Sequence, residues 1–428
     1  MSRPVIGFAG MTHLGLLSAV AAAERGFPAV AFDPDPARVD ALRRGELPVV
    51  EPGLPELLAK NRGRLSFTSA TADLAGCDVV YVAPDIPTDD VGVSDLGPIR
   101  ALIEALDPAL RSDAVLVVLS QVPPGFTRSL RRPAARRFYQ VETLIFGRAV
   151  ERALNPERFI VGCADPQAPL PPPLAEFLGA FGCPVLPMRY ESAELAKISI
   201  NMCLVASIST ANTLAEVCEK VGADWAEIVP ALRLDKRIGQ HAYLAPGLGI
   251  AGGNLERDLA TICRLADAHG TDAGVVRAWM DNSHHRRDWA LTQVHERVIA
   301  QIPEPTLAVL GLAYKPDTAS TKNSPALGLL AALAPFAVRV YDPAVTPRRE
   351  FHPRLVTAAS ALDACAGADA LVIMTPWSEF RELRAEAIAA RLHGLTVIDP
   401  YAVLDGDGCR AAGLVHLTLG AAPAEVVA

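Results

Sequence analysis

The chain of 428 residues is long enough for two or three domains, and with 50% hydrophobic and 21% charged residues its composition is that of a soluble globular protein. The formal net charge of −8, the lack of a signal-peptide pattern and the lack of a run of roughly 18 apolar residues give no support for a nucleic-acid-binding, secreted or membrane protein. The eight cysteines are scattered without a C-x-x-C pair, which predicts reduced thiols, a cytoplasmic protein and no metal site.

The beginning of the chain predicts a dinucleotide-binding unit made of a strand, a helix and a second strand. A buried strand at residues 5–9 leads into the turn Gly10-Met-Thr-His-Leu-Gly15, a helix at 16–25 and a strand at 29–32 that ends at Asp33. A helix N-terminus binds a diphosphate, and a carboxylate placed as Asp33 is accepts ribose hydroxyls, which favours NAD over NADP. We therefore expect six residues of this unit to contact NAD: Gly10, Thr12, His13, Leu14, Gly15 and Asp33.

Two further strands, at residues 78–83 and 114–119, end at Pro84 and at Ser120-Gln121. Because ligands of open α/β sheets lie beyond the carboxyl ends of the strands, we expect these three residues to contact the cofactor as well. Thr12 stands where the usual motif has its second glycine, and its side chain crowds a diphosphate. A doubly wound domain that has lost its cofactor is therefore the alternative.

A long helix is predicted from Glu191 to about Gly222, because apolar residues recur there at spacings of three and four. Lys197 and Asn201 are four residues apart and so share one helix face. Their neighbours are apolar, so we expect this helix to be largely buried, and a buried lysine needs a partner or a function. A helix of this length after an α/β domain also favours a dimer interface.

A glycine-rich loop follows, with the sequence Gly247-Leu-Gly-Ile-Ala-Gly-Gly-Asn254-Leu-Glu-Arg-Asp258. Glycines allow a backbone to approach a ligand closely, and the loop ends in an amide, a guanidinium and carboxylates. We interpret it as a ligand-binding loop. A plain glycine-rich turn at the start of a helix is the alternative.

Strand patterns return in the last third, at residues 306–311, 338–342, 368–375 and 395–399. They predict a second, smaller doubly wound domain. The expected fold class is therefore α/β, with two Rossmann-like doubly wound domains joined by a long central helix.

The order of these pieces resembles the UDP-glucose/GDP-mannose dehydrogenase family over nearly the whole chain. The matching motifs are Glu51-Pro-Gly-Leu-Pro-Glu-Leu-Leu, Asp235-Lys-Arg-Ile-Gly, the glycine-rich loop, Gly311-Leu-Ala-Tyr-Lys-Pro-Asp-Thr and Val340-Tyr-Asp-Pro. The resemblance implies an NAD-binding Rossmann domain at residues 1–190, a central helical dimerisation domain at 191–300 and a nucleotide-sugar-binding Rossmann-like domain at 301–428. It also implies a homodimer.

Members of this family oxidise a sugar hydroxymethyl group to a carboxylate by two hydride transfers to NAD, through a cysteine-bound thiohemiacetal and thioester. The resemblance implies that Lys197 and Asn201 stabilise the oxyanion and position a water, that Asp258 helps to take the first proton, and that Glu142 belongs to the catalytic set. Arg237 matches an arginine that reaches the sugar of a neighbouring subunit. The implied substrate contacts are Leu144, Arg237, Tyr243, Gly249, Tyr314 and Lys315, and Lys322 is an implied cofactor contact.

The chain departs from the family at the nucleophile. The family's cysteine aligns with Asn254, which cannot form a thiohemiacetal or a thioester because an amide nitrogen is not nucleophilic. The nearest cysteine is Cys263, five residues after Asp258. Further departures are Gln121, Phe146, Arg257, Lys322 and Tyr401, of which the last stands in place of an arginine.

We therefore expect an NAD-dependent oxidoreductase that acts on a UDP- or GDP-sugar by a single hydride transfer, without a thioester. The alternatives are a full 6-dehydrogenase that forms the uronic acid through a hydrated aldehyde, an epimerase that works by internal redox, and a non-catalytic nucleotide-sugar-binding homologue. The joint presence of Lys197, Asn201 and Asp258 favours an enzyme, because a scaffold has no chemical use for all three.

Overall fold

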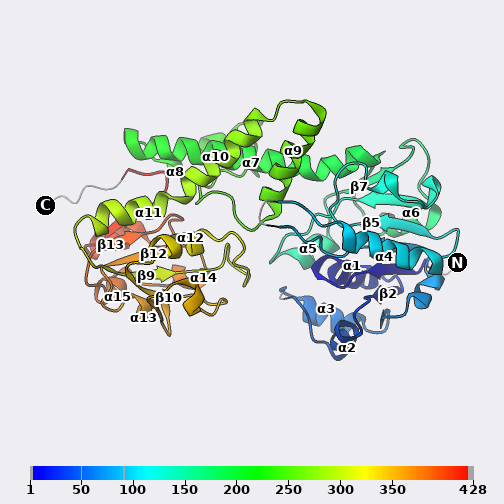
Figure 1. The fold of residues 1–428 in the computed structure, drawn as a ribbon, viewed down its shortest axis with the longest axis horizontal. Helices are drawn as coiled ribbons and strands as arrows, with labels where there is room; N and C mark the ends of the chain where they lie inside the picture. The colour runs from blue at the N-terminus through cyan, green and yellow to red at the C-terminus, as the bar shows by residue number, and fades with distance from the viewer. Residues whose placement is uncertain (1–2, 50, 90–91, 423–428) are drawn as a thin grey trace. The chain divides into compact units, whose positions relative to one another are not determined.

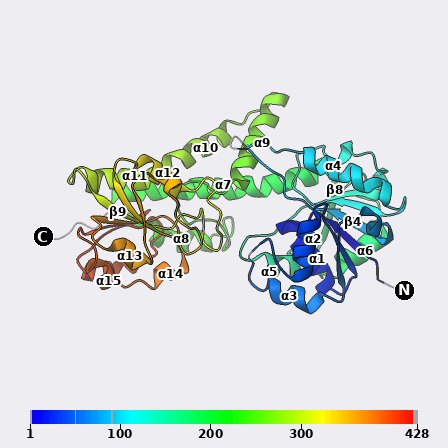
Figure 2. The same ribbon diagram turned by 60° about the horizontal axis from the view of Figure 1, so that its bottom comes forward.

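The chain divides into two compact units, residues 1–200 and 201–428 (Figures 1 and 2). The computed structural model describes residues 3–49, 51–89 and 92–422. Each unit contains one sheet, and both sheets are of the open α/β type, so the predicted fold class is confirmed.

The first unit is built on an eight-stranded sheet in the order β3-β2-β1-β4-β5-β6-β7-β8. Neighbouring strands are parallel except β6 and β7, which are antiparallel. The strands are β1 (Ile6–Ala9), β2 (Ala29–Phe32), β3 (Leu65–Thr68), β4 (Val79–Val82), β5 (Val115–Val118), β6 (Arg137–Gln140), β7 (Phe159–Cys163) and β8 (Val185–Arg189).

Hydrophobic cores cover both faces of this sheet. One core joins α1 (His13–Glu24), α3 (Leu54–Asn61) and α6 (Pro172–Gly179) to the strands, and the other packs α4 (Gly97–Leu106) against them. The other helices and turns of the unit are α2 (Pro36–Arg44), α5 (Ala149–Leu154) and the 3₁₀ turns Thr71–Gly76, Asp107–Ala109, Thr127–Ser129 and Ala134–Arg136.

The second unit contains a six-stranded parallel sheet in the order β11-β10-β9-β12-β13-β14. Its strands are β9 (Thr306–Leu310), β10 (Ala337–Tyr341), β11 (Leu355–Thr357), β12 (Ala370–Ile373), β13 (Thr396–Ile398) and β14 (Val415–Leu417). The helices around it are α12 (Pro325–Ala332), α13 (Ala361–Cys365), α14 (Ser378–Arg381), α15 (Ala385–Ala389) and α16 (Gly406–Ala411), with a 3₁₀ turn at Arg349–Phe351.

Helices precede the second sheet along the chain. They are α8 (Trp225–Leu234), α9 (Asn254–His269), α10 (Gly274–Arg287) and α11 (Trp289–Val294), which continues into a π-helical turn at His295–Ile299. The longest helix, α7 (Tyr190–Val221), has 32 residues and continues from the first unit into the second, close to the predicted bounds.

The prediction that this helix is largely buried is wrong. Leu195, Leu214, Val217 and Val221 are exposed by 39 to 68% in the single chain. The apolar residues of α7 therefore occupy more of the helix surface than is buried in the single chain. By length and composition α7 could also cross a membrane, a property that it shares with core helices of soluble proteins.

Asp342, directly after β10, is hydrogen-bonded to the turn that follows β9. Its Oδ2 atom accepts hydrogen bonds from the backbone N–H groups of Leu312 and Ala313, at 2.6 and 3.1 Å, and from the Trp377 indole at 3.2 Å. Its Oδ1 atom accepts two more backbone N–H groups, each at 2.7 Å. Five donors on one buried carboxylate fix the ends of β9 and β10 relative to each other.

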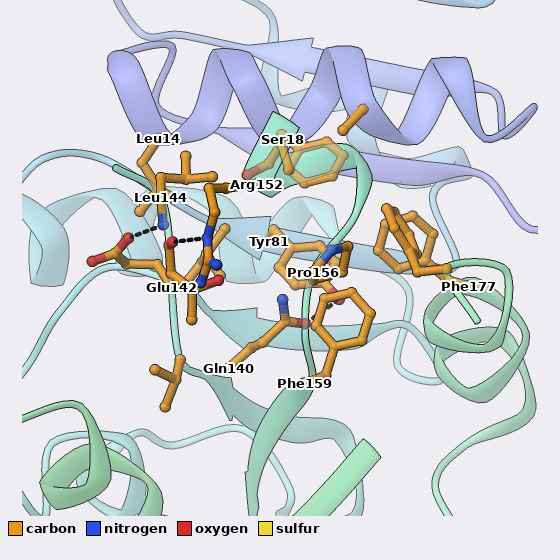
Figure 3. Close-up of a pocket in the computed structure, with 17 residues that line it drawn as sticks. Leu14, Ser18, Tyr81, Gln140, Glu142, Leu144, Arg152, Pro156, Phe159 and Phe177 are labelled. Atoms are coloured by element: carbon orange, nitrogen blue, oxygen red, sulfur yellow. Dashed lines mark hydrogen bonds between the residues drawn. The ribbon is translucent and has the colours of Figure 1, made fainter. Parts of the chain in front are cut away.

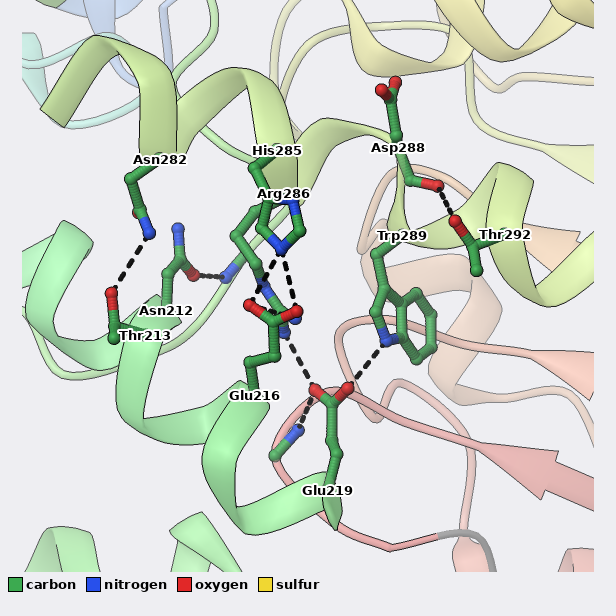
Figure 4. A network of polar contacts seen from close by, with 12 residues as sticks. Asn212, Thr213, Glu216, Glu219, Asn282, His285, Arg286, Asp288, Trp289 and Thr292 are labelled. Carbon is green, nitrogen blue, oxygen red and sulfur yellow. Dashed lines mark hydrogen bonds and ion pairs between the residues drawn. The ribbon is translucent and has the colours of Figure 1, made fainter. Parts of the chain in front are cut away.

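Glu219 ties α7 to the start of α11 (Figure 4). Its carboxylate accepts hydrogen bonds from Arg286 at 2.8 Å, from the Trp289 indole at 2.9 Å and from the backbone N–H of Gly420 at 3.0 Å. Arg286 is only 1% exposed, so its charge depends on this carboxylate. One turn earlier on α7, Glu216 pairs with His285 at the surface.

We predict that Glu219→Ala lowers the free energy of unfolding by about 3–5 kcal/mol, because it leaves a buried guanidinium without its closest carboxylate. Glu216→Ala on the same helix serves as the comparison and should cost less, since its carboxylate is farther from Arg286, at 3.6 Å, and its closer partner His285 is exposed. Denaturant unfolding of both variants measures the difference. Equal losses in the free energy of unfolding would show that Glu219 is not the main partner of Arg286.

Candidate active site

The turn between β1 and α1 brings together most of the predicted cofactor contacts. Gly10 has a φ of +96°, and a Cβ there would lie 2.7 Å from the backbone nitrogen of Pro84. A Cβ on Gly15 would lie 1.9 Å from the carbonyl oxygen of Gly10. Both positions therefore require glycine for packing alone. Thr12 is the N-cap of α1, and Leu14 is buried in the first helical turn.

Asp33 ends β2 as predicted, and its side chain is almost completely buried. The carboxylate accepts hydrogen bonds from the backbone N–H groups of Met11 and Asp35, at 2.7 and 3.0 Å, and from the Arg38 guanidinium at 3.1 Å. A carboxylate can accept about four hydrogen bonds, so three donors leave capacity for a ribose hydroxyl. Arg38 covers this position and was not among the predicted site residues.

The loops after β4 and β5 are joined by Ser120. This buried hydroxyl donates to the carbonyl oxygen of Pro84 at 2.5 Å, so two of the predicted cofactor loops are held together at the carboxyl end of the sheet. Gln121 follows it and is half-buried.

The segment after β6 carries Glu142, whose carboxylate lies 2.8 Å from the Lys197 ammonium and also accepts the Leu144 backbone N–H at 3.0 Å. The Lys197 and Glu142 side chains are 13 and 18% exposed, so this ion pair is largely shielded from solvent. The predicted lysine therefore has a partner, and the catalytic and substrate contacts predicted in this segment lie together.

A cavity lies behind this segment (Figure 3). Apolar and aromatic side chains make up most of its wall, among them Phe159 and Phe177. Deeper in the cavity the Tyr81 hydroxyl donates to the Gln140 amide oxygen at 2.9 Å. The cavity is therefore mainly apolar, and the Tyr81 and Gln140 side chains in its wall are bonded to each other.

His13 and Glu51 form a buried pair beside the cofactor turn. Nε2 of His13 lies 2.8 Å from Glu51, which also accepts the backbone N–H of Gly147 at 3.0 Å. Phe146, one of the departures from the family, stacks on the His13 ring with centroids 4.1 Å apart. The role of Glu51 was not predicted, although its motif Glu-Pro-Gly-Leu was recognised.

In the second unit, Asn201 and Asp258 are in direct contact. The Asn201 amide donates to Oδ2 of Asp258 at 2.5 Å, and Nε of Arg257 lies 3.3 Å from Oδ1. All three residues are buried, and Asp258 is only 1% exposed. The Asn201 amide thus fixes the orientation of the Asp258 carboxylate.

The glycine-rich loop between α8 and α9 takes backbone conformations that other residues avoid. Gly249, Gly252 and Gly253 have φ values of +72°, +93° and +99°. A Cβ on Gly249 would lie 2.3 Å from the Ser283 carbonyl oxygen, and one on Gly252 would lie 2.4 Å from the Tyr314 ring. The predicted substrate contacts Gly249 and Tyr314 therefore belong to one packed loop region.

Both ends of this loop are anchored. The Gly247 N–H donates to the Asn212 side chain of α7 at 2.8 Å, and the Gly252 N–H donates to the backbone oxygen of Lys322 at 3.2 Å. Tyr401 packs against Gly247, and burial raises the pKa of Tyr401 to about 12, so its hydroxyl stays neutral at the position where the resemblance implies an arginine.

A second set of contacts around the loop was not predicted from the sequence. Glu256, in the first turn of α9, accepts a hydrogen bond from Arg287 at 3.1 Å and another from the Asn323 amide. Arg287 also donates to the backbone oxygen of Ile250 at 2.9 Å. These side chains come from three distant segments, so spacing along the chain gives no signal for them.

Two predicted substrate contacts lie at the surface. The Arg237 side chain is 89% exposed and pairs with Asp235 at 2.6 Å, and Tyr243 is 49% exposed. The Lys315 ammonium lies over the Tyr314 ring, 5.8 Å from its centroid. Nothing in the single chain brings Arg237 into the loop region, so its predicted role across a subunit boundary stays a prediction.

Asn254, the first residue of α9, is exposed and stands four residues before Asp258. Cys263 lies nine residues further along the same helix, among apolar side chains. At about 1.5 Å per residue it is displaced by roughly 13 Å along the helix axis from Asn254. Within the described part of the chain, no His, Cys, Asp and Glu side chains are grouped so as to hold a metal ion.

Three parts of the chain match domains of the UDP-glucose/GDP-mannose dehydrogenase family. Residues 5–170 match its NAD binding domain, residues 191–284 its central domain and residues 308–406 its UDP binding domain. The first of these matches confirms NAD as the predicted cofactor.

Individual relatives cover nearly the whole chain. A UDP-glucose 6-dehydrogenase of Pseudomonas aeruginosa is 32% identical over 91% of this chain and 91% of its own length, and one of Haloferax volcanii is 33% identical over 89% and 93%. A UDP-glucose dehydrogenase structure from Pyrobaculum islandicum has a TM-score of 0.86 and 26% identity, and covers 98% of both chains.

We predict that Gly252→Ala disrupts the glycine-rich loop. The new Cβ meets the Tyr314 ring and the backbone is strained at positive φ, so the loss in the free energy of unfolding should exceed about 1–3 kcal/mol. Gly270→Ala is the matched control, because Gly270 also has a positive φ but has open space around it. Thermal unfolding of the two variants separates steric overlap from backbone strain. A loss no larger in Gly252→Ala than in the control would rule out a tightly packed loop.

Proposed function

This chain belongs to the UDP-glucose/GDP-mannose dehydrogenase family, and we propose that it removes a single hydride from a UDP- or GDP-sugar without forming a thioester. The observation that carries this proposal is the residue at the start of α9. There the chain has the exposed amide of Asn254, whereas the resemblance places the nucleophilic cysteine of the family at this position.

The first oxidation needs groups that this chain retains. The hydroxyl group of the sugar loses its proton through a water to Asp258, and the carbon that carries this hydroxyl loses a hydride to NAD. The products are a carbonyl group, NADH and a proton. The buried amide of Asn201 keeps the Asp258 carboxylate in place, and the Lys197 ammonium, positioned by Glu142, stabilises the developing oxyanion.

The second oxidation depends on a thiol, and this chain has no thiol at position 254. Formation of an acid through a thioester requires a thiol next to the carbonyl carbon, and the amide of Asn254 cannot attack it. Cys263 lies on the same helix but roughly 13 Å further along its axis, among apolar side chains. The reaction therefore ends at the carbonyl compound, which is either released or reduced again on the enzyme.

The substrate is assigned to the nucleotide-sugar class. The UDP binding domain matched by residues 308–406 and the UDP-glucose 6-dehydrogenases among the relatives support a UDP-sugar in particular. Tyr314, Lys315, Gly249 and Leu144 are the substrate contacts that we propose. The three-part division at residues 190 and 300, with dimerisation through the middle part, belongs to the same proposal.

The proposed dimer rests on an apolar surface of α7 and α8. Leu214, Val217 and Val221 share one face of α7, and Ile228 and Leu234 on α8 are also exposed. Val217→Asp should therefore convert the protein from a dimer into a monomer in sedimentation experiments. Val275→Asp, at an exposed valine of α10, should leave the dimer intact. A wild-type monomer would refute the proposed interface.

We predict one NADH per nucleotide sugar consumed. Purified protein is mixed with NAD and a panel of UDP- and GDP-sugars, NADH is followed by absorbance, and the sugar product is identified by mass spectrometry. An altered sugar without NADH would identify internal redox. Two NADH per sugar would refute the single-hydride proposal, and binding of the sugar without turnover would identify a non-catalytic nucleotide-sugar-binding homologue.

The variant that tests the role of position 254 in the same assay is Asn254→Cys. It places a thiol at the exposed start of α9, and the expected outcome is two NADH per sugar with the acid as product. Cys263→Ala should leave the wild-type stoichiometry unchanged, because this thiol is too far along the helix to take part. A loss of turnover in Cys263→Ala, with the fold intact, would instead identify a displaced nucleophile.

A further inference from the structure

A basic cavity lies in the first unit, at the amino ends of β1 and β3. It is formed by the end of α1, the end of α3 and the residues that lead into the two strands, and its volume is about 490 Å³. The charged residues of its wall are Arg3, Glu24, Arg25, Lys60 and Arg64. The cofactor turn lies at the other end of α1, a helix of 12 residues and therefore about 18 Å long. The cavity is thus separate from the predicted NAD contacts.

The wall of this cavity is strongly positive, although the whole chain carries a net charge of −8. Its one carboxylate, Glu24, already has partners: it accepts a hydrogen bond from Asn61 at 2.6 Å and pairs with Lys60 at 2.5 Å. These two contacts lower the pKa of Glu24, so it stays ionised at neutral pH. Among the residues that the structure describes, the three arginines of the wall form no ion pair with a carboxylate. Their charges are therefore available to an anion.

Two of the arginines are held in place by groups that do not neutralise them. The Arg3 guanidinium lies over the Phe27 ring, 4.7 Å from its centroid, and donates to the backbone oxygen of Arg25. The Arg25 guanidinium lies over the Phe181 ring at 5.2 Å and donates to the backbone oxygen of Leu154. Its Nε atom is buried and has no hydrogen-bond partner among the described residues. An anion that binds here meets charges that are already positioned, which lowers the entropic cost of binding.

A purely structural role explains only part of this arrangement. Arginines near the end of a helix interact favourably with its last carbonyl groups, which accounts for Arg3 and Arg25 at the end of α1. Arg64 belongs instead to the turn before β3, where its exposed side chain adds a further charge to the same cavity. The cationic side chains thus converge from three separate segments of the chain.

We propose that this cavity binds a small anion with two or more phosphate groups. The planar guanidinium group matches the oxygens of a phosphate with two parallel hydrogen bonds, and several such groups favour a ligand of several charges. The volume lies within the range of roughly 300–1,000 Å³ that is usual for small-molecule sites. The wall offers charges rather than apolar faces, so the phosphate groups are what it recognises. This inference is independent of the proposed single-hydride chemistry.

The bound anion joins the end of α1 to the turn before β3. Because it binds the folded first unit through contacts that the unfolded chain lacks, it should raise the unfolding temperature of the protein. The charges of the wall are partly exposed to solvent, so the affinity should fall as the ionic strength rises.

Isothermal titration calorimetry with inorganic pyrophosphate tests the proposal. The protein is first saturated with NAD and UDP, which occupy the sites for the diphosphates of the cofactor and of the nucleotide sugar, and divalent cations are left out. We expect one pyrophosphate to bind per chain. In Arg64→Gln the dissociation constant should rise about tenfold, because one charged hydrogen-bond donor is lost.

Arg62→Gln is the matched control. Arg62 is exposed in the same turn as Arg64 but does not line the cavity, so this variant should bind pyrophosphate as the wild type does. Sulfate, which has a single anionic group, should bind at least about tenfold more weakly at equal ionic strength. The proposal is overturned if the wild type does not bind pyrophosphate, if Arg64→Gln binds it unchanged, or if Arg62→Gln weakens binding equally.

Discussion

A buried carboxylate must be matched by N–H donors, and the loops of this protein are arranged around that requirement. An unpaired buried charge costs several kcal/mol, so each such carboxylate collects the segments that can supply donors. Glu51 gathers the backbone at Gly147 together with His13, and Glu194 on α7 takes the N–H groups of Gly125 and Thr127. Glu219 joins the end of the described chain to α7 in the same way. The segments around the candidate active site are therefore held in place by hydrogen bonds to buried carboxylates as much as by hydrophobic packing.

Asn254, on which the proposed function rests, lies outside this framework. Asp258 and Asn201 are buried and bonded to each other, so replacing either would disturb packing as well as function. Asn254 is exposed at the first position of α9, where most side chains can be accommodated. An amide or a thiol at this position is compatible with the same folded framework. A change of side chain at this position therefore need not disturb the architecture or the buried polar contacts.

Much of the fold could be predicted because its strongest elements carry local signals. Continuous apolar runs predicted β4 and β5, and the glycine turn with Asp33 predicted β1, α1 and β2. By contrast, β3 and β8 are partly exposed and carry polar residues, so neither alternation nor a continuous apolar run marks them. The contact between Asn201 and Asp258 joins residues 57 positions apart, and only the resemblance put both in one site.

Each sheet has an aspartate directly after its second strand along the chain, but the two carboxylates accept different numbers of hydrogen bonds. Asp33 after β2 receives three donors, whereas Asp342 after β10 receives five, which is more than the roughly four lone-pair directions of a carboxylate. Asp342 thus has no capacity left to hold the ribose of a dinucleotide. The second sheet therefore repeats the Rossmann architecture without repeating the carboxylate acceptor that the first sheet keeps for a ribose.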